Sequence, residues 1–89
     1  MSEAQDQKKC RSLAAAYGWL SYKLAAPGHR GVPDVMFIKG GRIIFVEFKN
    51  FNGKGRLSAL QTRTIERMQG AGADVMVIDS MKDFMEVFC

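Results

Sequence analysis

Two adjacent glycines, Gly40 and Gly41, constrain the fold of this sequence more than any other feature. They interrupt the stretch GVPDVMFIKGGRIIFVEFKN, residues 31–50, and a mainly apolar run lies on each side of them. Apolar runs joined by two glycines predict a β-hairpin with a two-residue turn, because such turns need positive φ angles that glycine adopts at little cost. We therefore expect antiparallel strands at Asp34–Lys39 and Arg42–Lys49.

The register of this hairpin decides which charged side chains meet. Counting outward from the turn places Asp34 directly opposite Glu47, and facing residues have Cβ atoms about 5 Å apart. Side chains alternate along a strand, so Glu47 and Lys49 lie on one face and Phe48 on the other. Asp34, Glu47 and Lys49 are therefore expected to converge at one end of the hairpin.

The other hairpin positions are apolar on both faces, which is typical of an interior strand pair covered on both sides. One face carries Met36, Ile38, Ile43 and Phe45, and the other carries Val35, Phe37, Ile44 and Val46. We expect helices to pack on this sheet.

Local signals outside the hairpin predict three helices and two further strands. Ser2 and Ser58 are each followed three residues later by glutamine, which is capping-box spacing, and glycines end both segments. The expected elements are a helix over Ser2–Ala16, a strand over Trp19–Ala25, a loop over Ala26–Pro33, a glycine-rich loop over Phe51–Arg56, a helix over Ser58–Gln69, a strand over Ala73–Ile78 and a helix from the cap Ser80 to about Phe88. The last strand should pair in parallel through a right-handed crossover. The sequence thus predicts one α/β domain, residues 1–89, with a mixed sheet in the order α-β-β-β-α-β-α.

Two carboxylates that face each other at a half-buried strand end indicate a metal site. Like charges at this distance repel, and a hard divalent cation removes the conflict. Mg²⁺ prefers oxygen ligands, commonly one or two carboxylates with waters and phosphate oxygens. Lys49 then lies where an ammonium group can stabilise charge on a phosphate or help to orient an attacking water. The alternative is a simple strand-end salt bridge between Lys49 and either acid.

A modest excess of positive charge favours a polyanionic partner. The formal net charge is +4 and the sequence pI is about 9.3. Basic residues flank both ends of the expected site and continue along the next helix: His29, Arg30, Lys54, Arg56, Arg63 and Arg67. They are candidate phosphate contacts, which supply affinity without reading sequence, or else solvated surface charges. Cys10 and Cys89, with a single histidine, cannot complete a four-ligand zinc site, so we expect structural cysteines.

The charged residues of the hairpin also resemble a known nuclease signature. Pro33-Asp34 followed by Glu47-Phe48-Lys49 resembles the PD-(D/E)XK pattern. The segments GVPD, IIFVEFK, LSALQ and GADVMVIDS are similar to the VRR-NUC family of virus-type replication-repair nucleases, and the resemblance covers nearly the whole chain. It implies a restriction-endonuclease-like fold and Mg²⁺- or Mn²⁺-dependent hydrolysis of DNA phosphodiesters. By position, Asp34 and Glu47 would bind metal with the carbonyl of Phe48. Lys49 would be the catalytic lysine.

Two residues outside the hairpin complete the set that the resemblance implies. Glu3 corresponds to the acidic residue of the family's first helix and would be a further metal ligand. It is alternatively an acid in a first helical turn, where the helix dipole favours it. Gln61 corresponds to the glutamine on the helix after the active strand and would belong to the catalytic group. Its alternative role is that of capping partner to Ser58.

The resemblance further implies a homodimer that cuts branched DNA such as four-way junctions. We expect no membrane segment and no organic cofactor, and a cytoplasmic location in a bacterial or phage-infected cell. Three alternatives stay open. One is a non-catalytic nucleic-acid-binding module on the same fold, another is a nuclease acting on simple duplex or flap DNA, and the third is an RNA or nucleotide phosphohydrolase.

Overall fold

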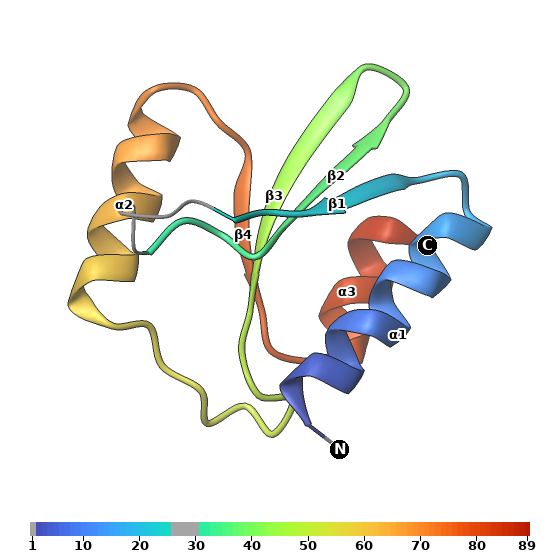
Figure 1. Cartoon of the computed structure of the whole chain (residues 1–89), viewed down its shortest axis with the longest axis horizontal. Helices are drawn as coiled ribbons and strands as arrows, with labels where there is room; N and C mark the ends of the chain where they lie inside the picture. The colour runs from blue at the N-terminus through green and yellow to red at the C-terminus, as the bar shows by residue number, and fades with distance from the viewer. Residues whose placement is uncertain (1, 26–30) are drawn as a thin grey trace.

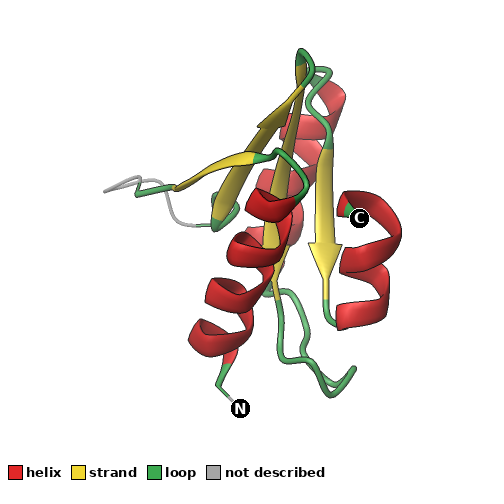
Figure 2. Ribbon diagram, turned by 90° about the vertical axis from the view of Figure 1, so that its right-hand side faces the viewer, coloured by secondary structure: helices red, strands yellow, loops and turns green. Residues whose placement is uncertain are grey.

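The computed structural model describes residues 2–25 and 31–89, and its elements follow the predicted order. They are α1 (Glu3–Ala16), β1 (Leu20–Lys23), β2 (Val35–Lys39), β3 (Arg42–Phe48), α2 (Ala59–Gly70), β4 (Val75–Ile78) and α3 (Met81–Phe88). One sheet has the strand order β1-β2-β3-β4, antiparallel except for the parallel β3–β4 pair. Helices α1 and α3 lie on one side of the sheet and α2 on the other (Figures 1 and 2). The predicted mixed α/β sheet is confirmed. No helix in the described ranges has the length and apolar character needed to cross a bilayer.

The hairpin between β2 and β3 has the predicted turn and register. Both turn glycines have positive φ, 59° and 80°, as a two-residue hairpin turn requires. The ladder ends with Val35 opposite Val46. The next position outward therefore sets Asp34 against Glu47, although Asp34 itself lies in a bend before the strand.

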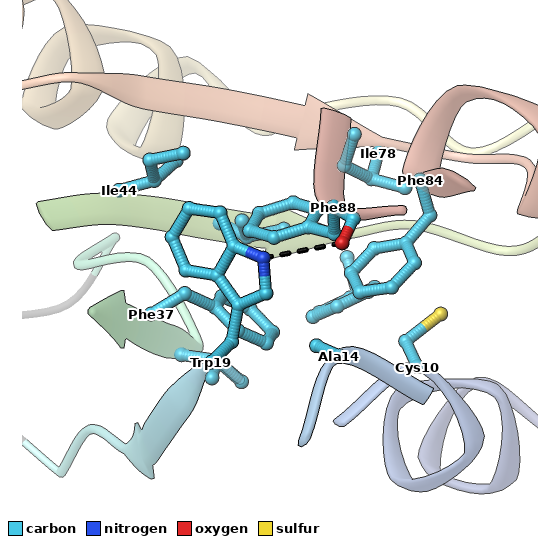
Figure 3. Close-up of a cluster of buried hydrophobic side chains, with 11 residues drawn as sticks. Cys10, Ala14, Trp19, Phe37, Ile44, Ile78, Phe84 and Phe88 are labelled. Carbon is cyan, nitrogen blue, oxygen red and sulfur yellow. Dashed lines mark hydrogen bonds between the residues drawn. The ribbon is translucent and has the colours of Figure 1, made fainter. Parts of the chain in front are cut away.

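The main core lies between the sheet and the pair α1 and α3 (Figure 3). Inward side chains of β2 and β3 are fully buried here: Val35, Phe37, Ile44, Val46 and Phe48. Phe84 and Phe88 stack with ring centroids 4.5 Å apart. Trp19 closes this layer and donates its Nε1–H to the carbonyl oxygen of Phe88 at 3.1 Å. Burial raises the pKa of the Cys10 thiol to about 12, as a structural cysteine requires.

The opposite side of the sheet is only partly covered, which corrects the expectation of an interior strand pair covered on both sides. Helix α2 lies against β4 and buries Ile65. A helix about 10–12 Å across covers only about two strands spaced at about 4.8 Å. Four apolar side chains on this side stay exposed: Leu20 (53%), Tyr22 (51%), Ile43 (46%) and Val77 (40%). Strand pairing places them on one face with the half-buried Met36 and Ile38. We call these six side chains the open face.

Candidate active site

The end of β3 brings Glu47 and Lys49 together on the side of the sheet that α2 covers. Phe48, between them, points the other way and is fully buried in the main core. Nζ of Lys49 lies 3.6 Å from Oε2 of Glu47, and both side chains are largely buried. The backbone N–H of Lys49 donates to the carbonyl of Ile78 at 2.9 Å. Pairing with β4 therefore continues through the lysine and fixes its position.

Asp34 reaches the same strand end from the bend before β2. Its Oδ2 accepts the backbone N–H of Phe48 at 2.9 Å, and its carbonyl accepts the N–H of Leu24 at 2.8 Å. The carboxylate is close enough to Glu47 to raise the pKa of that residue. The sequence predicts that these acids meet, but not this hydrogen bond. It forms because β2 begins only at Val35, opposite Val46, so no residue of that strand lies opposite Phe48.

Gln61 links the acid and the lysine from α2. Its Oε1 accepts the Lys49 ammonium at 3.0 Å, and its Nε2 donates to Oε2 of Glu47 at 3.1 Å. The same Oε1 also accepts the backbone N–H of Ser58 at 2.9 Å, completing the capping box with Ser58 Oγ and the Gln61 N–H. Gln61 is thus the capping partner of Ser58 and also contacts Glu47 and Lys49, because the helix cap fixes the backbone that directs its amide toward them.

Glu47 carries the clearest electrostatic perturbation of any acid in the described chain. Desolvation, then repulsion from Asp34 and more weakly from Glu3, outweighs attraction to Lys49 and raises the pKa of Glu47 to about 7. The residue is 3% exposed. Its Oε1 is buried without a hydrogen-bond partner among residues 2–25 and 31–89. A bound cation would remove the cost of that unsatisfied oxygen.

The oxygen donors at this strand end fit a hard divalent cation. Two carboxylates, those of Asp34 and Glu47, are available. The N–H and C=O of one strand residue point to the same neighbour, so the Phe48 carbonyl faces the edge where Asp34 lies. Such an all-oxygen set suits Mg²⁺ or Mn²⁺. Glu3 lies within electrostatic range, but the described residues form no group of three or more acids, histidines or cysteines around one point.

Four of the six predicted phosphate contacts lie among the described residues. His29 and Arg30 lie outside the described residues. The other four side chains are exposed: Lys54 and Arg56 in the loop after β3, and Arg63 and Arg67 on α2. The structure thus leaves these four cations accessible to a polyanion.

Sequence reasoning missed the tight packing of the loop against the lysine. A Cβ at Gly55 would lie 2.7 Å from the Cβ of Lys49, so only glycine permits the loop to fold back this closely. At Gly31 a Cβ would lie 2.9 Å from Oγ1 of Thr64 and 3.0 Å from the carbonyl of Leu60, and its φ is +88°. Both glycines hold loops against the site. The glycine content of these two segments was the only sequence signal for this close packing.

Comparisons with known proteins agree with the fold. A scan of protein-family models finds no match. The phage protein named "Putative nuclease p44", from Acyrthosiphon pisum secondary endosymbiont phage 1, is 41% identical over 75 residues, covering 83% of this chain and 78% of that protein. A solved structure described as a VRR_NUC domain superposes with a TM-score of 0.85 at 32% identity, over 96% of this chain and 91% of the other.

Proposed function

The chain belongs to the VRR_NUC family, and on that premise we propose that it is a metal-dependent endonuclease that hydrolyses DNA phosphodiesters. One observation carries the proposal. A buried carboxylate, Glu47, has one oxygen held by Gln61 beside Lys49 and the other oxygen unsatisfied, with Asp34 adjoining. A simple salt bridge explains the first oxygen but leaves the second unexplained.

Asp34, Glu47 and the carbonyl of Phe48 would hold the metal. When bound, a divalent cation supplies charge neutralisation for the phosphate and lowers the pKa of an attacking water. Asp34 is oriented by the Phe48 N–H and Glu47 by Gln61, so both carboxylates are positioned before substrate arrives. Such preorganisation saves the reorganisation that a mobile site would need during reaction.

Lys49 is the proposed electrostatic partner of the phosphate. Its ammonium is held by Oε1 of Gln61 at 3.0 Å and by Glu47. An ammonium carries three donors, so a further N–H is available to a phosphate oxygen or to the attacking water. Partial burial strengthens its interaction with charge that develops in the transition state.

Lys54, Arg56, Arg63 and Arg67 would hold the DNA backbone through phosphate contacts. They lie on the loop and the helix that follow the active strand. His29 and Arg30, which precede Asp34 in the sequence, are proposed to contribute as well.

We further propose that two copies associate through the open face. Several exposed apolar side chains on one face of a sheet are costly to leave in water and indicate an interaction site. The exposed side chains of this face are Leu20, Tyr22, Ile43 and Val77, and a two-fold pair would bury the same patch from both copies. Because Glu47 lies on the same side of the sheet, the pair would present two cutting sites to one branched DNA, such as a four-way junction.

A cleavage panel tests the proposal. Linear duplex, flap, bubble and four-way junction would each be incubated with Mg²⁺, Mn²⁺, Ca²⁺ or EDTA, using the parent, Asp34→Asn and Lys49→Ala. Cleavage that needs Mg²⁺ or Mn²⁺, prefers the junction and is lost in both variants is the expected result. Unchanged cutting by either variant would refute the mechanism. DNA binding by the parent with no cutting under any condition would instead indicate a non-catalytic binding module.

A further inference from the structure

The first turn of α2 lies directly beside the charged pair of the candidate site. Gln61, the third residue of the helix, contacts Glu47 through its Nε2 at 3.1 Å and Lys49 through its Oε1 at 3.0 Å. The same Oε1 accepts the backbone N–H of Ser58 at 2.9 Å, and Oγ of Ser58 accepts the backbone N–H of Gln61 at 3.1 Å. The cap of α2 therefore shares one oxygen atom with the site.

The orientation of the Gln61 amide matters because its two charged neighbours need opposite groups. A carboxylate only accepts hydrogen bonds, and an ammonium only donates them. The amide satisfies both when its oxygen faces Lys49 and its NH₂ group faces Glu47. An amide rotated by half a turn would direct its oxygen at the carboxylate and its NH₂ group at the ammonium, and both contacts would become repulsive. The observed contacts therefore require one of the two amide orientations.

Ser58 favours this orientation over the other. Its backbone N–H is a further donor to Oε1, so it stabilises the amide oxygen on the side of Lys49. The N–H reaches Oε1 because Oγ of Ser58 binds the backbone N–H of Gln61 and holds the extended cap residue, with φ −80° excluded by its observed φ of −69° and ψ of 163°, against the first turn. Removing Oγ would release one side of this reciprocal pair of hydrogen bonds.

The cap of α1 shows the same arrangement without a charged partner. Ser2 and Gln5 form an equivalent capping box, with hydrogen bonds of 2.9 and 3.2 Å. Gln5 is exposed, and within residues 2–25 and 31–89 its side chain takes part in this cap alone. A capping box thus forms at a helix end without any further contact. The contacts of Gln61 with Glu47 and Lys49 are therefore additional to the cap of α2.

Neighbouring backbone leaves the first turn of α2 and the lysine little room to move. Gly31 approaches the helix so closely that a Cβ there would lie 3.2 Å from Cα of Gln61 and 3.0 Å from the carbonyl oxygen of Leu60. Gly55 approaches the lysine in the same way, and its Cβ would lie 2.7 Å from Cβ of Lys49. The main freedom left to Gln61 is the rotation of its side chain, which is the movement that the cap restricts.

We propose that Ser58 is a positioning residue of the active site, which acts through the Gln61 amide on Glu47 and Lys49. Gln61 holds Oε2 of Glu47 and so leaves Oε1, which has no hydrogen-bond partner in the described chain, for the proposed metal. Replacing a residue that orients a metal ligand commonly lowers metal affinity or activity by about 10–100-fold. The effect on cleavage rests on the proposed function, whereas the link from Ser58 to the Gln61 amide does not.

The side-chain NH₂ signals of Gln61 in NMR spectra of metal-free protein test this link without cleavage. These protons should exchange slowly with water, because Nε2 donates to the buried Glu47. Ser58→Ala should speed their exchange by about tenfold. Ser80→Ala is the matched control, since it removes the N-cap of α3, where Oγ accepts the Asp83 N–H at 3.1 Å, on the other side of the sheet (Figure 1). It should leave the Gln61 signals unchanged, and signals that respond to both substitutions equally, or to neither, would overturn the proposal.

Cleavage kinetics test the effect on the site. Ser58→Ala and Ser80→Ala should lower the urea midpoint of unfolding by similar amounts, because each removes one N-cap. Only Ser58→Ala should also lower kcat, by about tenfold, with KM unchanged because the exposed cations proposed to hold DNA remain. Ser58→Thr keeps a hydroxyl at the cap and should restore kcat. If Ser58→Ala fails to fold, Ser58→Gly, which a helix tolerates better at this position, should show the same loss. Equal kcat values for the Ser58 and Ser80 variants would overturn the positioning role.

The positioning role and the proposed function fail in different ways. If Asp34→Asn and Lys49→Ala abolish cutting but Ser58→Ala cuts as fast as Ser80→Ala, only the positioning role of Ser58 is wrong. If Asp34→Asn and Lys49→Ala still cut, the proposed function is wrong, and the exchange of the Gln61 signals still decides whether Ser58 holds the amide.

Discussion

The two sides of the sheet differ in how completely they are covered, and consecutive isoleucines on β3 show the contrast. Ile44 is fully buried in the aromatic layer beneath α1 and α3, whereas its neighbour Ile43 is 46% exposed on the open face. The side that α1 and α3 cover therefore contributes most of the stability of the fold. The other side leaves apolar surface free and carries Glu47 and Lys49 at its end, where α2 begins.

This difference explains how one small domain accommodates a costly charged site. Phe48 is buried on the side of the sheet that α1 and α3 cover, and this holds the end of β3 in place. Because side chains alternate along the strand, Glu47 and Lys49 point to the opposite side. Helix α2 buries this end enough to raise the pKa of Glu47 to about 7, while the exposed basic residues nearby remain open to a ligand. The main core and the charged residues of the candidate site therefore lie on opposite sides of the sheet.

The largest expected effect is on folding, and it contrasts the two isoleucines. Ile44→Ala should lower the free energy of unfolding by about 2–5 kcal/mol, because it leaves a cavity in a packed core. Ile43→Ala should cost less than about 1 kcal/mol when measured at low protein concentration, where association adds little. Urea unfolding followed by circular dichroism measures both. Equal losses would mean that the two sides are not differently packed.

Substituting Lys49 should lower the cleavage rate strongly and the stability only slightly, the opposite of the result expected for Ile44→Ala. Lys49→Ala should reduce the cleavage rate by about 10²–10³-fold, the usual effect of removing one group that stabilises a transition state. The unfolding curve should change far less than for Ile44→Ala. Lys82→Ala, at an exposed position on α3, is the matched control and should cut normally. An active Lys49→Ala variant would remove the lysine from the mechanism.

The hairpin was predictable from sequence because its information is local. Two glycines, the alternation of the strands and the position of Asp34 relative to Glu47 fix the register without reference to the rest of the chain. The coverage of the sheet was not predictable in the same way. Apolar residues on both faces of β2 and β3 indicate burial, but they do not reveal that α2 covers only part of one side. Nor does the pattern of α1 reveal that Asp6 is buried beside the loop after β3.

The pH dependence of stability tests the burial of Glu47. Its folded pKa of about 7 lies above the ordinary value of 4.5, so between these values the folded state holds a proton that the unfolded state has released. The metal-free protein should therefore lose stability as the pH rises from 4.5 to above 7, by up to about 3 kcal/mol. Urea unfolding in EDTA at pH 5 and pH 8 measures this. Glu47→Gln should flatten the difference, and a slope that persists in this variant would assign it to another group.

Association through the open face is tested by placing a charge on it. Ile43→Asp should remain folded, because the position is exposed, but should sediment as a monomer where the parent sediments as a dimer. Sedimentation velocity over a range of protein concentrations measures this. Arg63→Asp, exposed on α2, is the control and should leave the oligomeric state unchanged. A parent protein that stays monomeric at high concentration would leave the open face without this role.

The smallest expected effect concerns the exposed cations. Arg63→Ala should weaken DNA binding a few-fold and reduce the slope of log affinity against log salt by about 0.9, the value for one lost phosphate contact. Arg42 makes a good control because it is paired with Asp74 at 3.1 Å near the hairpin turn. Arg42→Ala should keep the slope of the parent. An unchanged slope for Arg63→Ala would show that Arg63 does not contact a DNA phosphate.

The central claim is that Asp34 and Glu47 bind a divalent metal ion. Calorimetric titration of the protein with Mn²⁺ at pH 8 tests this claim most directly, because it measures metal binding without DNA or cleavage. Parent protein and Glu66→Gln should bind with equal affinity, while Glu47→Gln and Asp34→Asn should bind at least tenfold more weakly. Parent-like binding by a folded Glu47→Gln variant, or no binding by the parent, would contradict the account.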